Sequence, residues 1–287
     1  MPYPSSVVKP ASQDLLHLTV LRTEQLSPHW MRITLGGGDI DRFTPLGFDQ
    51  WFRLFLPLGG DEGLERIPAK AHKIFGYLKY LRIPDGVRPV MRNYTVRAFR
   101  PATVDAGAEL DVDFVLHGSG PASGPASRWA QSAQPGESVV LIDEGLRFNP
   151  ERGVDRVLLV GDETAAPAIA GICASLPAHA TGVAIVEVPT ADDVLDFSAP
   201  AGIDVRWLAR NADAKPGAAA LKALQALPTP APGTHAYIAG EQELPTAARR
   251  HLVAQGVGKH AISFLGYWRV GAASPAPKSQ QALAAEH

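Results

Sequence analysis

The chain has 287 residues, of which 46% are hydrophobic and 20% charged, a composition typical of a globular protein. Its 27 basic and 29 acidic side chains give a net charge of −2, which argues against a nucleic-acid-binding surface. The single cysteine, Cys173, excludes a disulfide framework and a cysteine-rich metal site, so we expect no protein-bound metal. No apolar run approaches the roughly 20 residues that cross a bilayer. The N-terminus lacks the pattern of a secretory signal, so we expect a cytoplasmic protein without a membrane span.

The first half of the chain predicts β-strands. Short segments rich in β-branched and aromatic residues cover 17–22, 30–35, 51–56, 92–99, 109–117 and 138–142. In the fifth segment Leu110 and Phe114 alternate with Asp111 and Asp113, as in a strand with one buried face. One short helix, beginning near Ala126, interrupts the series. Six strands without long helices between them indicate an antiparallel six-stranded β-barrel, to which we assign residues 1–150.

The second half predicts alternating strands and helices. Strands are expected at 156–160, 183–188, 204–208, 235–239 and 262–265, and helices at 164–176, 218–227 and 244–255. This alternation is typical of a parallel sheet with crossover helices, so residues 151–271 predict an α/β nucleotide-binding domain. Residues 272–287 are rich in alanine, proline and polar side chains and predict a flexible tail.

The first candidate site is Arg92-Asn-Tyr94-Thr95. Arg92 and Tyr94 share one face of the predicted strand, where an aromatic ring could lie against a flavin and a guanidinium could clamp a phosphate. Thr95 faces the other side and could reach the flavin edge. The alternative is an ordinary exposed strand that happens to carry an arginine and a tyrosine.

The second candidate site joins the end of strand 109–117 to the predicted helix. Asp113 and His117 lie on one face of the strand, and Gly-Pro-Ala-Ser then occurs twice, at 120–123 and 124–127. Unpaired N–H groups at a helix start suit a pyrophosphate, and glycine lets the ligand approach closely. We favour the second copy, with Gly124, Ala126 and Ser127, because the helix containing Trp129 follows it directly. The alternative is a plain capped helix beside a surface histidine.

Three candidate segments lie in the second half. Asp162-Glu163-Thr164 follows the first α/β strand, with Thr164 as the expected N-cap of the next helix. No Gly-x-Gly-x-x-Gly fingerprint is present, and the two acids would repel a phosphate, so they would serve sugar hydroxyls or only the helix dipole. Gly240-Glu241 ends the fourth strand, where ligands of parallel sheets bind. Gly266-Tyr-Trp-Arg269 follows the last strand and could cover a site or form a separate apolar patch.

Together these segments resemble the siderophore-interacting protein family of flavin reductases. The matching stretches, in the family's order, are RNYTVRAF at 92–99, DFVLHG at 113–118, GPASRWA at 124–130, LLVGDETAAPAI at 158–169, AGE at 239–241 and GYWR at 266–269. The resemblance implies that the barrel binds FAD, that the α/β half receives NADH or NADPH, and that electrons pass to Fe(III) held in a siderophore, releasing Fe(II).

The resemblance also implies roles for individual residues. The implied FAD contacts are Arg92, Tyr94, Thr95, Asp113, His117, Gly124, Ala126, Ser127 and Trp129. The implied NAD(P)H contacts are Asp162, Glu163, Thr164, Gly240 and Glu241. Arg53 stands where the family often has a lysine in a basic patch for anionic ferric chelates, and Arg269 is expected to belong to the same patch. No catalytic residue is assigned.

The electron donor and the acceptor remain open at this stage. The acidic Asp192-Asp193 pair after strand 183–188 disfavours a 2′-phosphate clamp and favours NADH, whereas Arg210 could hold the phosphate of NADPH. A ferredoxin is an alternative donor. One alternative function is an FAD-containing NAD(P)H reductase of a quinone or an iron–sulfur protein. Another is a siderophore-binding or flavin-binding protein without turnover. We expect a monomer.

Overall fold

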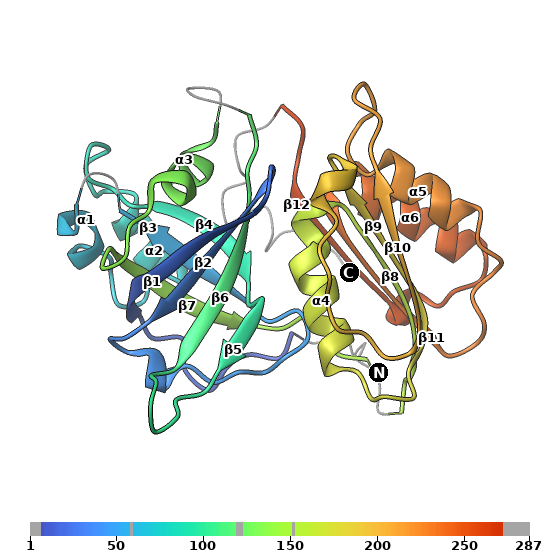
Figure 1. Cartoon of the computed structure of the whole chain (residues 1–287), viewed down its shortest axis with the longest axis horizontal. Coiled ribbons are helices and arrows are strands. Elements are labelled where there is room, and N and C mark those ends of the chain that lie inside the picture. The colour runs from blue at the N-terminus through green and yellow to red at the C-terminus, as the bar shows by residue number, and fades with distance from the viewer. Residues whose placement is uncertain (1–6, 58–59, 119–122, 151–152, 272–287) are drawn as a thin grey trace. The chain divides into compact units, whose positions relative to one another are not determined.

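The computed structural model describes residues 7–57, 60–118, 123–150 and 153–271. The chain divides into two compact units, Val7–Leu146 and a second unit that continues from Arg147. Figure 1 shows strands with short helices in the first unit and a sheet with longer helices in the second.

The first unit is built on one antiparallel sheet. Its strands are β1 (Leu16–Ser27), β2 (Trp30–Gly36), β3 (Trp51–Leu56), β4 (Val90–Thr95), β5 (Ala98–Arg100), β6 (Glu109–Val115) and β7 (Ser138–Gly145). They are ordered β4-β3-β7-β1-β2-β6-β5, and every neighbouring pair is antiparallel. The predicted antiparallel N-terminal half is therefore confirmed.

The prediction of six strands is wrong, because segment 92–99 is two strands. Val96 N donates to Gln50 O, which continues the pairing with β3, whereas Arg97 N donates to Asp111 O on β6. The chain thus leaves one edge strand, β4, and enters the opposite edge strand, β5, within two residues. The sheet must curve enough to bring its two edges together, as in a barrel.

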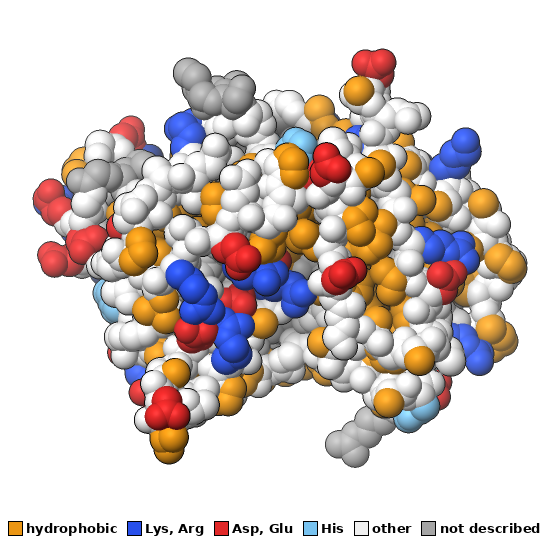
Figure 2. Space-filling view, in the orientation of Figure 1, with side chains coloured by type: hydrophobic (Ala, Val, Ile, Leu, Met, Phe, Trp, Pro, Cys, Tyr) orange, Lys and Arg blue, Asp and Glu red, His pale blue; other side chains and the backbone are white. Residues whose placement is uncertain are grey.

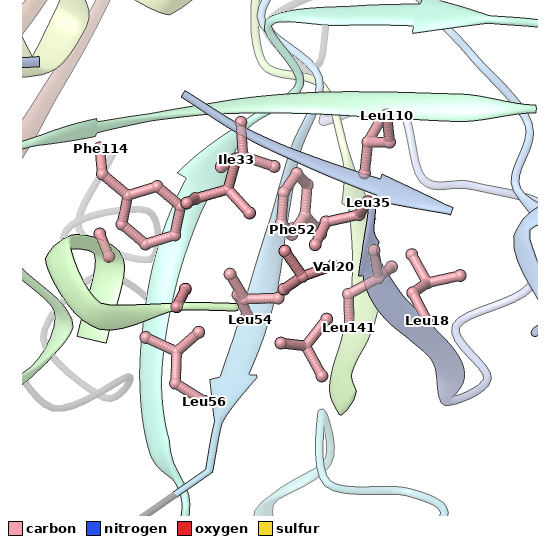
Figure 3. Close-up of a cluster of buried hydrophobic side chains, with 14 of the residues drawn as sticks. Leu18, Val20, Ile33, Leu35, Phe52, Leu54, Leu56, Leu110, Phe114 and Leu141 are labelled. Atoms are coloured by element: carbon pink, nitrogen blue, oxygen red, sulfur yellow. The ribbon is translucent and has the colours of Figure 1, made fainter. Parts of the chain in front are cut away.

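The interior of this sheet is filled by side chains from alternate positions of its strands. Leu110, Val112 and Phe114 of β6 are almost fully buried, which confirms the face predicted for that strand. Figure 3 shows Leu110 and Phe114 beside the apolar side chains of the other strands. The labelled members of this core are Leu18, Val20, Ile33, Leu35, Phe52, Leu54, Leu56, Leu110, Phe114 and Leu141.

Three α-helices accompany the sheet, where the sequence predicted one. The predicted helix is α3 (Pro125–Ser132). The two others are α1 (Glu62–Glu65) and α2 (Ile74–Tyr80), between β3 and β4. They are too short to show a clear helical period in the sequence. They cover a second, smaller core against Phe55 and Val140 of the sheet.

The second unit is a five-stranded parallel sheet, as predicted. Its strands are β8 (Arg156–Gly161), β9 (Thr181–Val188), β10 (Gly202–Ala209), β11 (Thr234–Glu241) and β12 (Ile262–Trp268), ordered β10-β9-β8-β11-β12. The helices are α4 (Ala166–Ser175), α5 (Ala218–Gln225) and α6 (Glu243–Ala254). Among the helices of the described ranges, none has the length and apolar character needed to cross a membrane.

Candidate cofactor and substrate site

Arg92 and Tyr94 of β4 lie side by side on one face of the strand. Their cross-strand partners on β3, Leu54 and Phe52, are both in the buried core. The Tyr94 ring lies 4.2 Å from the ring of Phe114, and burial raises the pKa of its phenol, which therefore stays neutral. Arg92 is half-buried, and its Nη1 donates to Met91 O at 2.8 Å. Within the described residues no carboxylate pairs with Arg92, so β4 presents an uncompensated cation beside an aromatic ring.

Helix α3 packs close to this strand. The ring of Trp129 on α3 is 5.6 Å from Phe114, so an aromatic row from Tyr94 through Phe114 to Trp129 joins β4, β6 and α3. Trp129 is buried, and its Nε1 donates to Glu137 at 3.1 Å, which assigns it to the core that positions the helix. The predicted contact between Trp129 and FAD therefore receives no support from its environment.

The start of α3 has the open geometry expected of an anion site. Gly124 is the N-cap, Pro125 opens the helix, and a Cβ placed on Gly124 would meet nothing within 4 Å. Ser123 Oγ is buried and has no hydrogen-bond partner among the described residues. Ala126 and Ser127 occupy the first turn, where backbone N–H groups lack intrahelical acceptors. The first Gly-Pro-Ala-Ser copy lies, apart from Ser123, outside the described residues.

Asp113 belongs to an ion-pair network on the other face of β6. Its two oxygens accept from Arg32 Nε and Nη2 at 2.7 and 2.9 Å, and Arg97 Nε lies 3.5 Å away. Asp111 is held in the same way by two bonds from Arg100, at 2.6 and 2.7 Å. Figure 2 shows blue and red side chains gathered over β5 and β6. Asp113 is thus engaged in holding strands together, whereas His117 is exposed just after β6 and Thr95 is buried at the end of β4.

Arg53, which the resemblance places in the basic patch for the substrate, is buried and ion-paired. Its side chain is only 6% exposed, and its Nε lies 2.8 Å from Glu144 Oε1. Lys9 and Gln13 donate to the other oxygen of the same carboxylate, at 3.1 and 3.0 Å. Position 53 therefore carries a neutralised, buried charge. The sequence did not reveal this because Glu144 is ninety-one residues away and belongs to another strand.

Asp162 is the hydrogen-bonding centre of the loops after β8 and β11. Its Oδ1 accepts from Thr164 N and Thr164 Oγ1, at 2.9 and 2.5 Å. Its Oδ2 accepts from Glu241 N at 2.6 Å and from Trp268 Nε1 at 3.0 Å. Asp162 therefore caps a 3₁₀ turn over Glu163–Ala165, and the N-cap of α4 is Ala165 and not the predicted Thr164. The structure does bring the three predicted segments, after β8, β11 and β12, to one place.

Glu163 and Arg210 form a buried pair at the same end of the sheet. Arg210 Nη2 lies 2.5 Å from Glu163 Oε2, and its Nε lies 3.3 Å from Glu187 Oε1. Glu187 also accepts three backbone N–H bonds from Gly217, Ala219 and Ala220, so its carboxylate occupies the N-terminus of α5. Sequence reasoning missed Glu187, since its role appears only when β9 and α5 are adjacent. Arg210 is held by two carboxylates and is not a free phosphate ligand.

The remaining predicted residues differ in exposure. Glu241 is buried and accepts from Glu243 N at 2.7 Å, which leaves its side chain engaged within the loop. Arg269 follows β12 and is exposed, with no ion pair to any described residue. Just before it, Tyr267 Oη lies 2.7 Å from Tyr237 Oη, a hydrogen bond that ties the end of β12 to β11. Of the two predicted substrate cations, only Arg269 is accessible.

Comparison with known proteins decides the family. Residues 19–147 match the family model of the siderophore-interacting FAD-binding domain, and residues 154–271 match that of the siderophore-interacting protein. The ferric vibriobactin reductase ViuB of Vibrio cholerae is 30% identical over 257 residues, which cover 88% of this chain and 89% of ViuB. The NADPH-dependent ferric-chelate reductase of Escherichia coli is 29% identical over 255 residues, covering 88% and 91%. A siderophore utilization protein from T. fusca has a TM-score of 0.76 and 29% identity, covering 94% and 99%.

The chain belongs to the siderophore-interacting protein family. Its first unit offers two features that suit a cofactor with phosphates and a ring system: Arg92 without a carboxylate partner beside Tyr94, and an open helix start with the unpartnered Ser123 hydroxyl. A phosphate oxygen could accept from that hydroxyl and from the first-turn N–H groups. The residues present therefore fit the cofactor named by the matching domain.

We expect Glu163 to make the stability of this siderophore-interacting protein depend on pH. Burial, together with the neighbouring Asp162, raises the pKa of Glu163 from 4.5 to about 7. Between these two values the folded protein binds more protons than the unfolded chain, so the free energy of unfolding falls as the pH rises. We expect Glu163→Gln to remove most of this fall, about 3 kcal/mol, which thermal unfolding below pH 4.5 and above pH 7 would measure.

The control for this experiment is Glu65→Gln, since Glu65 is exposed in α1. It should leave the pH profile of the melting temperature unchanged. An unaltered slope in Glu163→Gln would show that another group titrates in this range.

Proposed function

We propose that the protein is an FAD-dependent reductase that passes electrons from NAD(P)H to an Fe(III)-siderophore and releases Fe(II). The observation that carries the proposal is the pairing of Arg92 and Tyr94 on one face of β4, within a domain matched by an FAD-binding family model. The curated relatives in Vibrio cholerae and Escherichia coli are named as reductases of ferric vibriobactin and of ferric chelates, which supports the reaction class.

In this proposal the residues of the first unit bind and orient the cofactor. Arg92 neutralises a phosphate, Tyr94 offers its ring to the flavin, and the N–H groups of Ala126 and Ser127 receive the pyrophosphate. Thr95, His117 and Gly124 complete the proposed contacts. When bound, FAD accepts two electrons from a nicotinamide and delivers them one at a time, as ferric iron requires. The siderophore supplies the iron's coordination shell, so no protein ligand to the iron is needed.

The proposed donor site is the carboxyl end of the parallel sheet, at Asp162–Thr164 and Gly240–Glu241. Ligands of open α/β sheets bind at this end, where Gly240 packs directly against the Asp162 carboxylate. The acids at this end fix the conformation of the loops through the hydrogen bonds described above; they are Asp162, Glu163 and Glu241. A ferredoxin is the alternative donor. We place the reaction in the cytoplasm and expect the protein to act as a monomer.

The donor preference can be predicted from the electrostatics of this end of the sheet. Arg210 is neutralised by Glu163 and Glu187, and Asp192 is exposed after β9. Because Arg210 is already paired, the 2′-phosphate of NADPH would gain little binding energy from it. We therefore expect kcat/KM with NADH to equal or exceed that with NADPH. Steady-state kinetics with both nucleotides decides this. A strong preference for NADPH would contradict the proposed arrangement.

The proposed substrate cation is Arg269. An anionic ferric chelate would be attracted by this exposed guanidinium, and such an attraction weakens with salt. We expect Arg269→Gln to raise KM for an anionic ferric siderophore several-fold at low ionic strength, and to raise KM for a neutral one much less. An equal effect on both substrates would remove Arg269 from the substrate site.

Anaerobic spectroscopy of the purified holoprotein tests the function. NADH or NADPH should bleach the flavin absorbance, and a ferric siderophore should restore it with the formation of Fe(II), trapped by a ferrous chelator. Restoration by a quinone or an iron–sulfur protein, but not by a ferric siderophore, would favour a reductase of another acceptor. Absence of bleaching with either nucleotide and with reduced ferredoxin would favour a binding protein without turnover.

A further inference from the structure

Four large apolar side chains form an exposed ridge on α2 and the residue after it. The exposed fractions are 60% for Ile74, 81% for Phe75, 42% for Leu78 and 42% for Leu81. Positions 74, 78 and 81 follow helical spacing and share one face, and Phe75 flanks it. These four are half of the large hydrophobic residues found exposed in the described ranges, and they fall within eight consecutive positions. Such clustering marks an interaction surface, whereas isolated exposed leucines do not.

The opposite side of α2 is firmly anchored. Tyr80 is buried against Phe55 of β3, with ring centroids 5.6 Å apart, and its Oη donates to Pro89 O at 2.7 Å. At Gly76 an added Cβ would lie 1.9 Å from Lys70 O, so the helix and the preceding loop are in direct backbone contact. The ridge therefore points outward from a fixed element and is not a loosely docked segment that could turn its apolar side inward.

The same segment is strongly cationic. Residues 66–84 contain five lysines and arginines and no aspartate or glutamate, although the chain has a net charge of −2. Lys70, Lys73, Lys79 and Arg82 are exposed and form no ion pair with any described residue. At the two ends of the segment Glu62 pairs with Arg66 and Asp85 pairs with Arg88, whereas the exposed Asp61 and Glu65 form no ion pair with any described residue.

We infer that this α2 surface, residues 70–82, binds the face of an anionic lipid bilayer. Apolar and cationic residues alternate directly along it: Lys73 precedes Ile74, Lys79 follows Leu78, and Arg82 follows Leu81. A helix that lies in a membrane interface places apolar side chains below the headgroups and keeps lysine and arginine at the lipid phosphates. This binding is peripheral and does not depend on the proposed reductase activity.

A bilayer accounts for the surface better than an acidic protein does. An acidic partner would explain the four unpaired cations. It would leave Phe75, the most exposed member of the ridge, without an apolar environment unless it also offered a pocket at that point. An anionic bilayer supplies both the apolar interior and the negative surface in one medium.

The full-length protein can be tested with vesicles of phosphatidylglycerol and phosphatidylcholine, and with vesicles of phosphatidylcholine alone. We expect co-sedimentation with the first, weakening as salt is added, and much less with the second. Phe75→Ser should reduce the partition coefficient about tenfold. Lys73→Gln and Lys79→Gln should each reduce it about fivefold. A Phe75→Trp variant should show a blue shift of its added tryptophan emission on binding.

Two matched controls keep the result specific. Val104 is fully exposed in a loop of the same unit, and Lys259 is exposed in the second unit, so Val104→Ser and Lys259→Gln should leave partitioning unchanged. Failure to bind anionic vesicles overturns the inference. Binding that depends on neither the lysines nor Phe75 also overturns it, because the bilayer would then contact another surface of the protein.

Discussion

Arg92→Ala is expected to purify with little or no flavin while keeping the folded barrel. Arg92 makes no ion pair in the described part of the chain, and its only hydrogen bond there is to the adjacent Met91 carbonyl. Replacing Arg92 should therefore change the free energy of unfolding very little. In contrast, a bidentate guanidinium–phosphate pair is a strong, charge-assisted interaction, so we expect FAD affinity to fall at least a hundredfold. The ratio of flavin to protein absorbance and titration with added FAD measure this.

Two further variants separate charge from geometry. Arg92→Lys keeps the positive charge but not the planar fork, so it should bind FAD with intermediate affinity. Arg82→Ala removes an exposed arginine of the same unit that lies outside the cofactor site, and it should retain its flavin. Full flavin occupancy in purified Arg92→Ala would remove Arg92 from the cofactor site. Loss of circular dichroism signal would instead indicate a structural role.

The sequence predicts the fold of each half because local patterns decide it. Alternation along β6 places Leu110 and Phe114 inside, and the rhythm of strand and helix after residue 150 permits only a parallel sheet. The break between β4 and β5 could not be read, since Val96 and Arg97 suit a strand. What divides the segment is that its two ends pair with different partners, β3 and β6. Pairing between distant strands is not encoded in a local pattern.

The candidate site divides in the same way. The aromatic row from Tyr94 through Phe114 to Trp129 joins β4 to α3, so two of the short motifs lie against one core side chain. Arg53 and Asp113 were assigned to ligands but are paired with Glu144 and Arg32. A charged side chain looks the same in the sequence whether it meets a substrate or an opposite charge across a sheet. Only the three-dimensional pairing distinguishes these two cases.

Gly240→Ala is expected to destabilise the second unit by about 3 to 5 kcal/mol. Gly240 has a φ of +135°, which only glycine adopts readily, and an added Cβ would lie 2.6 Å from Asp162 Cγ. The methyl group would displace the carboxylate that accepts from Thr164, Glu241 and Trp268. The loops after β8, β11 and β12 would then lose their common anchor. Thermal or denaturant unfolding measures the decrease in the free energy of unfolding. The rate of NADH oxidation should also decrease.

Gly233→Ala is the matched control for this change. Gly233 also has a positive φ, +82°, but a Cβ there would meet nothing within 4 Å. We expect Gly233→Ala to lower the free energy of unfolding by about 1 kcal/mol, because only the positive φ disfavours alanine there. The difference between the two variants therefore isolates the contact with Asp162. Equal destabilisation of both would mean that backbone conformation alone requires glycine at position 240, and that Asp162 does not organise the three loops as a unit.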